Sequence, residues 1–95
     1  MTELKRALIL APMTSELKPL LRYTGARRTD GNDPTAYTGR AGDIEVVITQ
    51  LGVGPTVART TTARALAMHP VDHVLVSGIA GGLDPSLGVG AVVVP

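Results

Sequence analysis

Three turns carry the residues of this chain whose types and spacing suit chemistry. The first, 11–16, ends in Glu16, and the other two, 51–55 and 77–83, are rich in glycine. Each follows an apolar run typical of a strand. In an open α/β sheet the carboxyl ends of parallel strands line the ligand crevice, so we expect the turns to meet at one edge. Their N–H groups could hold an anion or a hydroxyl group, although such glycines also serve tight turns alone.

Nucleotide fingerprints and metal-ligand patterns are absent. The segment 52–57, Gly-Val-Gly-Pro-Thr-Val, lacks the third glycine of GxGxxG, and no GxxxxGK[ST] occurs. The chain has no Cys. His69 and His73 lie four apart, but Pro70 breaks the helix that would pair them, so we expect surface or strand-edge histidines. The sequence therefore predicts neither a metal nor an organic cofactor.

The composition describes a small domain with an aliphatic core. Of 95 residues, 44% are hydrophobic, yet only two are Tyr and none is Phe or Trp. Nine basic and eight acidic residues without a long run argue against a nucleic-acid partner. The first apolar run, 7–12, is too short to span a membrane and lacks a signal-peptide cleavage pattern. We expect a cytoplasmic protein with no membrane partner.

Strands are predicted from apolar runs and from alternation. The runs 7–11, 71–77 and 89–94 indicate strands, and 36–40 with 44–50 indicates an antiparallel hairpin.

Helices are predicted after the first strand and after the hairpin. The first should have Thr14 or Ser15 as its N-cap and bury three leucines, with Pro19 delaying its start or kinking it. Pro55 suits the first position of the second. The polar segment 25–34 indicates an exposed loop.

The resulting order, β-α-β-β-α-β-β, predicts an α/β fold in which a mixed β-sheet is flanked by helices, in one domain over 1–95. The last predicted strand has no covering helix, which leaves an apolar face or a strand edge open. We interpret this as a sign of truncation.

Four segments, in this order, resemble the methylthioadenosine/S-adenosylhomocysteine nucleosidases of the nucleoside phosphorylase and nucleosidase superfamily. Residues 13–16 are similar to the methionine and last glutamate of the family's Ala-Met-Glu-Glu-Glu turn. Residues 51–54 resemble Ser-Gly-Ile-Gly, 77–83 resemble Thr-Gly-Ser-Ala-Gly-Gly-Leu, and 88–94 resemble Lys-Val-Gly-Asp-Val-Val-Val. The resemblance spans nearly the whole chain. It implies a phosphorylase/hydrolase-like three-layer sandwich, of which this chain is the N-terminal half.

The resemblance also implies a reaction, the cleavage by water of the N-glycosidic bond of a purine nucleoside of the 5′-modified adenosine type. Glu16 matches the glutamate that activates the water; as a residue alone it also suits a solvated first-turn position that favours the helix dipole. Met13 and Val53 match the pocket for the 5′ substituent, where core packing is the alternative. Ala80 and Gly81 match backbone beside the ribose and the base.

The sequence departs from the family pattern at two places. Ile79 replaces a serine that helps to place the nucleophile, and Thr14 and Ser15 replace acidic residues, leaving Glu16 as the turn's only carboxylate. The family's base-protonating aspartate, its ribose-binding Met-Glu pair and its stacking aromatic residue have no counterpart here. We therefore expect the isolated chain to be inactive.

Two alternatives stay open. A phosphorylase would use phosphate instead of water, with Arg40 as the candidate phosphate ligand across an oligomer interface, because Val76 and Ile79 stand where superfamily phosphorylases carry an arginine and a hydroxyl group. A truncated remnant or binding module would keep the fold without catalysis. For the enzyme, we expect a small-molecule nucleoside as substrate and a homo-oligomer in the full-length form.

Overall fold

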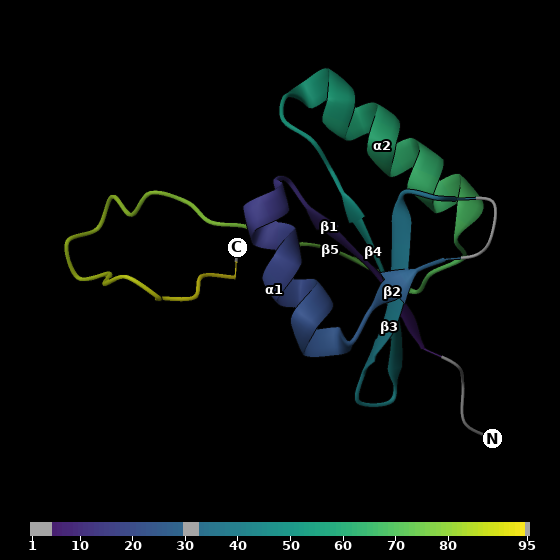
Figure 1. Cartoon of the computed structure of the whole chain (residues 1–95). Coiled ribbons are helices and arrows are strands. Elements are labelled where there is room, and N and C mark those ends of the chain that lie inside the picture. Colours follow the sequence, from purple (N-terminus) through teal and green to yellow (C-terminus); the bar gives the residue numbers. More distant parts are fainter. Residues whose placement is uncertain (1–4, 30–32, 95) are drawn as a thin grey trace.

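The computed structural model describes residues 5–29 and 33–94, and its centre is a five-stranded mixed sheet in the order β2-β3-β4-β1-β5 (Figure 1). The strands are β1 (Arg6–Ala11), β2 (Arg27–Arg28), β3 (Ala36–Ala41), β4 (Ile44–Gln50) and β5 (His73–Val76). The helices are α1 (Thr14–Thr24) and α2 (Pro55–Met68). The predicted mixed sheet with flanking helices is confirmed.

The strand β1 organises the sheet because it is paired on both sides. It runs parallel to β4 and to β5, so that Ile9 lies opposite Ile48 on one side and Leu75 on the other. The predicted hairpin is confirmed, since β3 and β4 pair antiparallel through a turn at Gly42, whose φ of 59° suits glycine.

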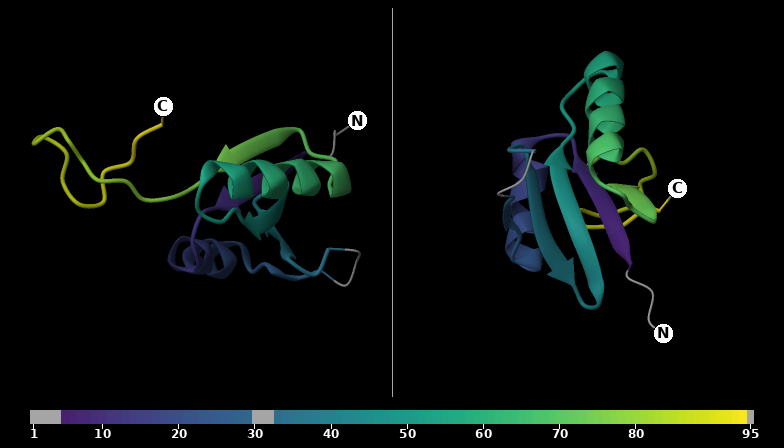
Figure 2. Two further views of the ribbon diagram at one scale, coloured as in Figure 1. Left: turned by 90° about the horizontal axis from the view of Figure 1, so that it is seen from above. Right: turned by 90° about the vertical axis from the view of Figure 1, so that its right-hand side faces the viewer.

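The helices cover opposite faces of the sheet, which makes three layers (Figure 2). Successive side chains of a strand point to opposite faces, and both faces of β1 and β4 are apolar. One core cluster contains Leu17 of α1, and the other contains Ala65 of α2. The α1-side cluster is Ala7, Ala11, Leu17, Val46 and Ile48; the α2-side cluster is Leu8, Leu10, Ala36, Val47 and Ala65.

The start of α1 differs from the prediction. Met13 is the N-cap, with its carbonyl accepting the N–H groups of Glu16 and Leu17 at 3.1 and 3.0 Å. Thr14 is therefore already helical, and its hydroxyl donates to the Gln50 side-chain oxygen of β4 at 3.2 Å instead of capping. Pro19 lies within the helix and does not delay its start. The N-cap predicted at Thr14 or Ser15 is wrong because the Thr14 hydroxyl has a tertiary partner that local sequence does not reveal.

The predicted strand over 89–94 is wrong. After β5 the residues 77–94 form neither helix nor strand, and this segment leaves the sheet in Figure 1. The apolar side chains of β5 remain exposed, with Leu75 at 54% and Val76 at 64%. An apolar run becomes a strand only where another strand pairs with it, and 89–94 has no such partner in the described part of the chain. The sequence predicts the open apolar face or edge at 89–94, whereas in the structure it is β5 whose apolar side chains are exposed.

The predicted exposed loop 25–34 also needs correction. Residues 30–32 lie outside the described part of the chain, so the correction concerns the other residues of this segment. Arg27 and Arg28 form the short edge strand β2 against β3. Asp33, at the end of the segment, is only 3% exposed. A polar residue can be buried at low cost where its hydrogen bonds are satisfied, and Asp33 has such partners.

A buried carboxylate joins the segment before β3 to α2. Asp33 accepts hydrogen bonds from the Thr35 backbone and hydroxyl at 3.1 and 2.6 Å, from Arg64 at 2.9 Å and from His69 at 3.0 Å. His69 is thus a partly buried partner, with a side chain 15% exposed, rather than a surface histidine. His73 lies exposed on the edge strand β5, as expected. Burial by itself raises the pKa of Asp33, but the bonds from Thr35, His69 and Arg64 outweigh it and hold that pKa at about 2, below the usual 3.8.

Replacing Asp33 by Asn should lower the free energy of unfolding by about 1–3 kcal/mol at neutral pH, because charge-assisted bonds are lost. A carboxylate with a lowered folded-state pKa stabilises the fold above its unfolded pKa of about 3.9, and loses this contribution as the pH falls through about 2. The difference in the free energy of unfolding between the unaltered chain and Asp33→Asn should therefore decrease as the pH falls from about 4 to about 2.

Urea unfolding followed by far-ultraviolet circular dichroism across pH 2–6 measures this difference. Asp43→Asn, in the exposed hairpin turn, is the matched control and should leave the stability near that of the unaltered chain. A difference that stays constant down to pH 2 would contradict the role given to the Asp33 carboxylate.

Candidate functional site

The three turns meet at one edge of the sheet, as the sequence predicts. The adjacent parallel strands β4, β1 and β5 all end there. The Leu51 N–H donates to the Ala11 carbonyl at 2.7 Å, and the Ser77 N–H donates to the Leu10 carbonyl at 2.9 Å. Both the second and the third turn are thus fixed to the end of β1.

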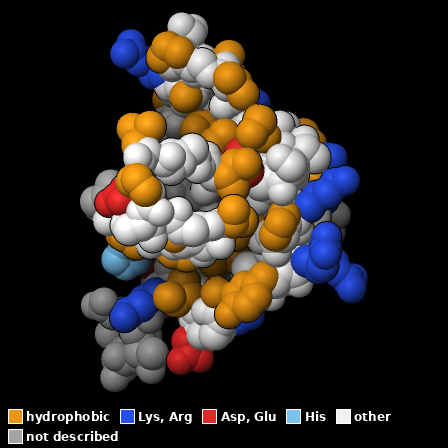
Figure 3. Space-filling view, turned by 90° about the vertical axis from the view of Figure 1, so that its left-hand side faces the viewer, with side chains coloured by type: hydrophobic (Ala, Val, Ile, Leu, Met, Phe, Trp, Pro, Cys, Tyr) orange, Lys and Arg blue, Asp and Glu red, His pale blue; other side chains and the backbone are white. Residues whose placement is uncertain are grey.

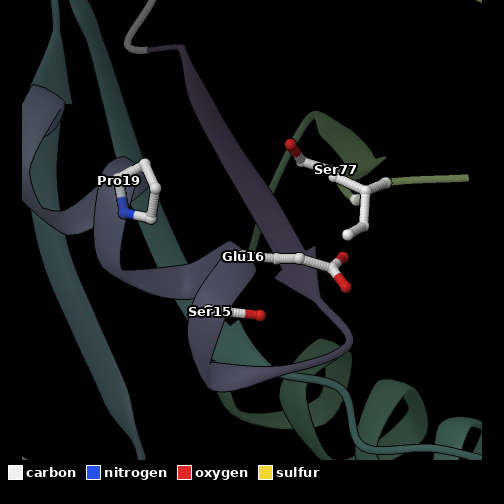
Figure 4. A pocket seen from close by; sticks show the side chains of 6 residues that line it. Ser15, Glu16, Pro19 and Ser77 are labelled. Carbon is white, nitrogen blue, oxygen red and sulfur yellow. The ribbon is translucent and has the colours of Figure 1, made fainter. Parts of the chain in front are cut away.

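A pocket of about 230 Å³ lies at this edge, between the first two turns of α1 and the start of the segment after β5. Figure 4 shows its walls, with Ser15, Glu16 and Pro19 coming from α1 and Ser77 coming from the chain after β5. The lining residues are Ser15, Glu16, Pro19, Ser77, Gly78 and Ile79. One carboxylate, two hydroxyl groups and apolar surface therefore surround the space.

Glu16 brings a hydrogen-bond acceptor without a donor to this pocket. Its Oε2 atom is buried and has no hydrogen-bond partner. Among the described residues, the ion pairs are Arg6–Glu45, Arg64–Asp33 and His69–Asp33, so Glu16 belongs to none. Nearly all buried polar atoms in proteins have a partner, and an exception calls for an explanation. A ligand hydroxyl group or a water molecule in the pocket would supply the missing donor.

Of the other residues predicted for the site, only Ile79 lines the pocket. Met13 is the half-exposed N-cap of α1, and Val53 lies in the turn before α2 with 74% of its surface exposed. Ala80 and Gly81 are exposed just beyond the pocket wall. The structure therefore brings Glu16 and Ile79 together, and it leaves the other four around the same sheet edge but outside the pocket.

Arg40 lies near the start of β1, at the opposite end of the strands from the pocket. It pairs with Glu45, which in turn lies opposite Arg6 at the start of β1, whereas the pocket is at the end of β1. At about 3.3 Å per residue, these two ends are roughly 15–20 Å apart. The Arg40 guanidinium instead reaches the Asp43 carbonyl at 3.4 Å. This chain does not bring Arg40 to Glu16.

Sequence reasoning did not assign four residues of the lining to the site: Ser15, Pro19, Ser77 and Gly78. Ser15 and Pro19 are four apart and so share one helix face, a spacing that could have identified them.

Figure 3 shows the side of the molecule around this region, with hydrophobic side chains over its middle and Lys and Arg side chains toward its margins.

Within residues 5–29 and 33–94, no group of three or more His, Cys, Asp or Glu is placed to hold a metal ion. No helix in the same ranges is long and apolar enough to cross a membrane.

The sheet order and the packing of one helix on each face define a three-layer α/β fold, and the Glu16 carboxylate lies at the carboxyl ends of its parallel strands. The model of the phosphorylase superfamily matches residues 6–95, and the chain belongs to that superfamily. A 5′-methylthioadenosine/S-adenosylhomocysteine nucleosidase from Colwellia psychrerythraea is 37% identical over 90 residues, which are 94% of this chain and 37% of that protein.

Solved structures give the same result. The Colwellia psychrerythraea nucleosidase in complex with adenine matches 93% of this chain with a TM-score of 0.77 and 34% identity. The S-adenosylhomocysteine nucleosidase of Streptococcus pyogenes, in complex with 5-methylthiotubericidin, matches 92% with a TM-score of 0.76 and 28% identity. The chain spans 37% of the length of each of these proteins. The resemblance to this family inferred from the sequence is confirmed.

Proposed function

We propose that this chain supplies the water-activating part of a nucleosidase active site, in a protein that cleaves the N-glycosidic bond of a nucleoside by hydrolysis. The observation that carries the proposal is the Glu16 carboxylate, whose buried and unpartnered Oε2 lies beside the pocket at the carboxyl edge of the sheet. The similarity to named nucleosidases supports it.

Glu16 would act as the acceptor for the proton of the attacking water. A water in the pocket donates to Oε2, which orients a lone pair toward the anomeric carbon of the sugar. As the bond to the base breaks, positive charge develops on the sugar, and the carboxylate takes the proton that the water loses. The acid that protonates the base and the groups that hold the ribose belong to the part of such a protein that this chain does not match.

The pocket favours water over phosphate as the nucleophile. Phosphate sites usually contain two or more arginines with further donors, whereas this lining has a carboxylate and no Lys or Arg. A dianion beside Glu16 would be repelled. Val76 and Ile79 add apolar surface where a phosphorylase needs donors, and Arg40 lies at the far edge of the sheet.

The proposed substrate is a small purine nucleoside of the 5′-modified adenosine type. The relatives named for 5′-methylthioadenosine and S-adenosylhomocysteine, and the adenine in the Colwellia psychrerythraea structure, support this choice. Met13 and Val53 are proposed for the 5′ substituent, and Ile79, Ala80 and Gly81 for the ribose and base. We further propose that 1–95 forms part of one domain of a homo-oligomer. The cytoplasmic location stays a prediction from the sequence.

Placing this chain in the Colwellia psychrerythraea nucleosidase, in exchange for the segment that it matches, should give a protein that releases adenine from 5′-methylthioadenosine without phosphate. Chromatography identifies the base, and the sugar product is the free sugar for hydrolysis or its 1-phosphate for phosphorolysis. The 95-residue chain alone should release no base, because the acid and ribose-binding groups are missing.

The unaltered Colwellia psychrerythraea enzyme is the control for activity, and circular dichroism with gel filtration is the control for folding. A folded chimaera that forms only the sugar 1-phosphate would favour the phosphorylase. A folded chimaera that releases no base at all would favour a binding module without catalysis.

In the same chimaera, Glu16→Gln should lower kcat by about 10²–10⁴-fold, because the amide keeps the size of the side chain but cannot take a proton. Glu45→Gln is the matched control, since Glu45 pairs with Arg6 at the opposite edge of the sheet. Turnover should survive this second change. If Glu16→Gln kept near-normal turnover, Glu16 would be only a helix-start residue.

A further inference from the structure

We infer that Gly78 is a positioning residue for Glu16, because the absence of a side chain at 78 provides the space in which the Glu16 carboxylate lies. This inference deepens the proposed function and rests on it for its catalytic consequence. The contact itself is independent of any reaction.

The space at Gly78 is occupied by the glutamate. A methyl group built on Gly78 would overlap Glu16 Oε2 and would lie 3.4 Å from Glu16 Cδ and 3.4 Å from Pro12 Cδ. The atom that it would displace is the same buried Oε2 that has no hydrogen-bond donor. Any side chain at 78 therefore competes with the carboxylate for its place beside the pocket.

Backbone conformation does not explain this glycine. The described glycines with positive φ are Gly25, Gly42, Gly52, Gly54 and Gly90, and Gly78 is not among them. An alanine could thus adopt the backbone conformation at 78. Gly81 and Gly88, in the same segment, have open space where a Cβ would stand. The constraint at Gly78 is steric, and Glu16 imposes it.

The surroundings decide which group must move. The preceding residue, Ser77, is held by its N–H bond to the Leu10 carbonyl at 2.9 Å, which ties the segment to the end of β1. Pro12 closes the other side with a rigid ring. The carboxylate is the far end of a flexible side chain, so an added methyl group would displace it rather than the backbone. The acceptor would then leave its buried position.

Displacement of a catalytic carboxylate should affect the chemical step more than substrate binding. In the chimaera, Gly78→Ala should lower kcat by up to about 10²-fold, a typical effect of a misplacement of about 1 Å. KM should change much less. Gly88→Ala, where nothing lies near the added methyl group, is the matched control and should retain the kinetic constants of the parent.

The side chain of aspartate is shorter by one carbon, which gives a test that a general folding defect would not satisfy. Glu16→Asp withdraws the carboxylate from Gly78 and should itself lower kcat. Adding Gly78→Ala to it should then cost little more, because the two groups no longer overlap. A double variant whose loss equals the product of the two single losses would overturn the inference, since residues in contact are coupled and independent ones are not.

A structural measurement on the 95-residue chain separates this inference from the proposed function. Nuclear Overhauser contacts between the Gly78 α-protons and the γ-protons of Glu16 should be present in the unaltered chain and in Gly88→Ala. In Gly78→Ala the contacts between residue 78 and the Glu16 γ-protons should be lost. If the chimaera were inactive but these contacts changed as described, only the proposed function would fail. If Glu16 kept its position in Gly78→Ala, the inference would fail whatever the activity.

Discussion

The structure depends on the parallel pairing of β1 with a strand on each side. Leu8 and Ala11 of β1 are completely buried, and every residue from Arg6 to Ala11 has a partner in β4. Parallel neighbours cannot be joined by a tight turn, so α2 must carry the chain across β1 from β4 to β5. That crossing places α2 on one face, while α1, which follows β1 directly, covers the other.

The same pairing creates the candidate site. Three parallel strands that lie side by side also end side by side, and the three turns after them share one edge. The first turn of α1 brings Glu16 to this edge, and the end of β5 brings Gly78 against it. The charged pair Arg6–Glu45 and the Arg40 side chain lie at the opposite edge. The carboxylate of the pocket is thus separated from these three residues by the length of β1.

Polar contacts outside the pocket add to the hydrophobic core near the start of β3. Asp33 ties the segment before β3 to α2 through Arg64, which lies within α2, and through His69, which is the C-cap of α2. A carboxylate this deeply buried is stable because its oxygens accept several hydrogen bonds at once. The α2 layer is therefore anchored at two places, by Ala65 in the core and by this network.

The catalytic role of Glu16 comes from the family resemblance and stays a prediction. The strands β1, β3 and β4, the start of α2 at Pro55 and the meeting of the three turns could be predicted from the amino-acid sequence. These follow from local patterns, in which apolar runs, alternation, proline and glycine have direct conformational meaning. Four features became visible only in the folded structure: Met13 and not Thr14 caps α1, the buried Asp33 bonds to the partly buried His69, 89–94 does not pair, and Gly78 gives room to Glu16. Each of these depends on a partner far away in the chain, such as Gln50 for Thr14 or α2 for Asp33. No local pattern encodes such a partner, because the contact exists only once the sheet has brought the two segments together.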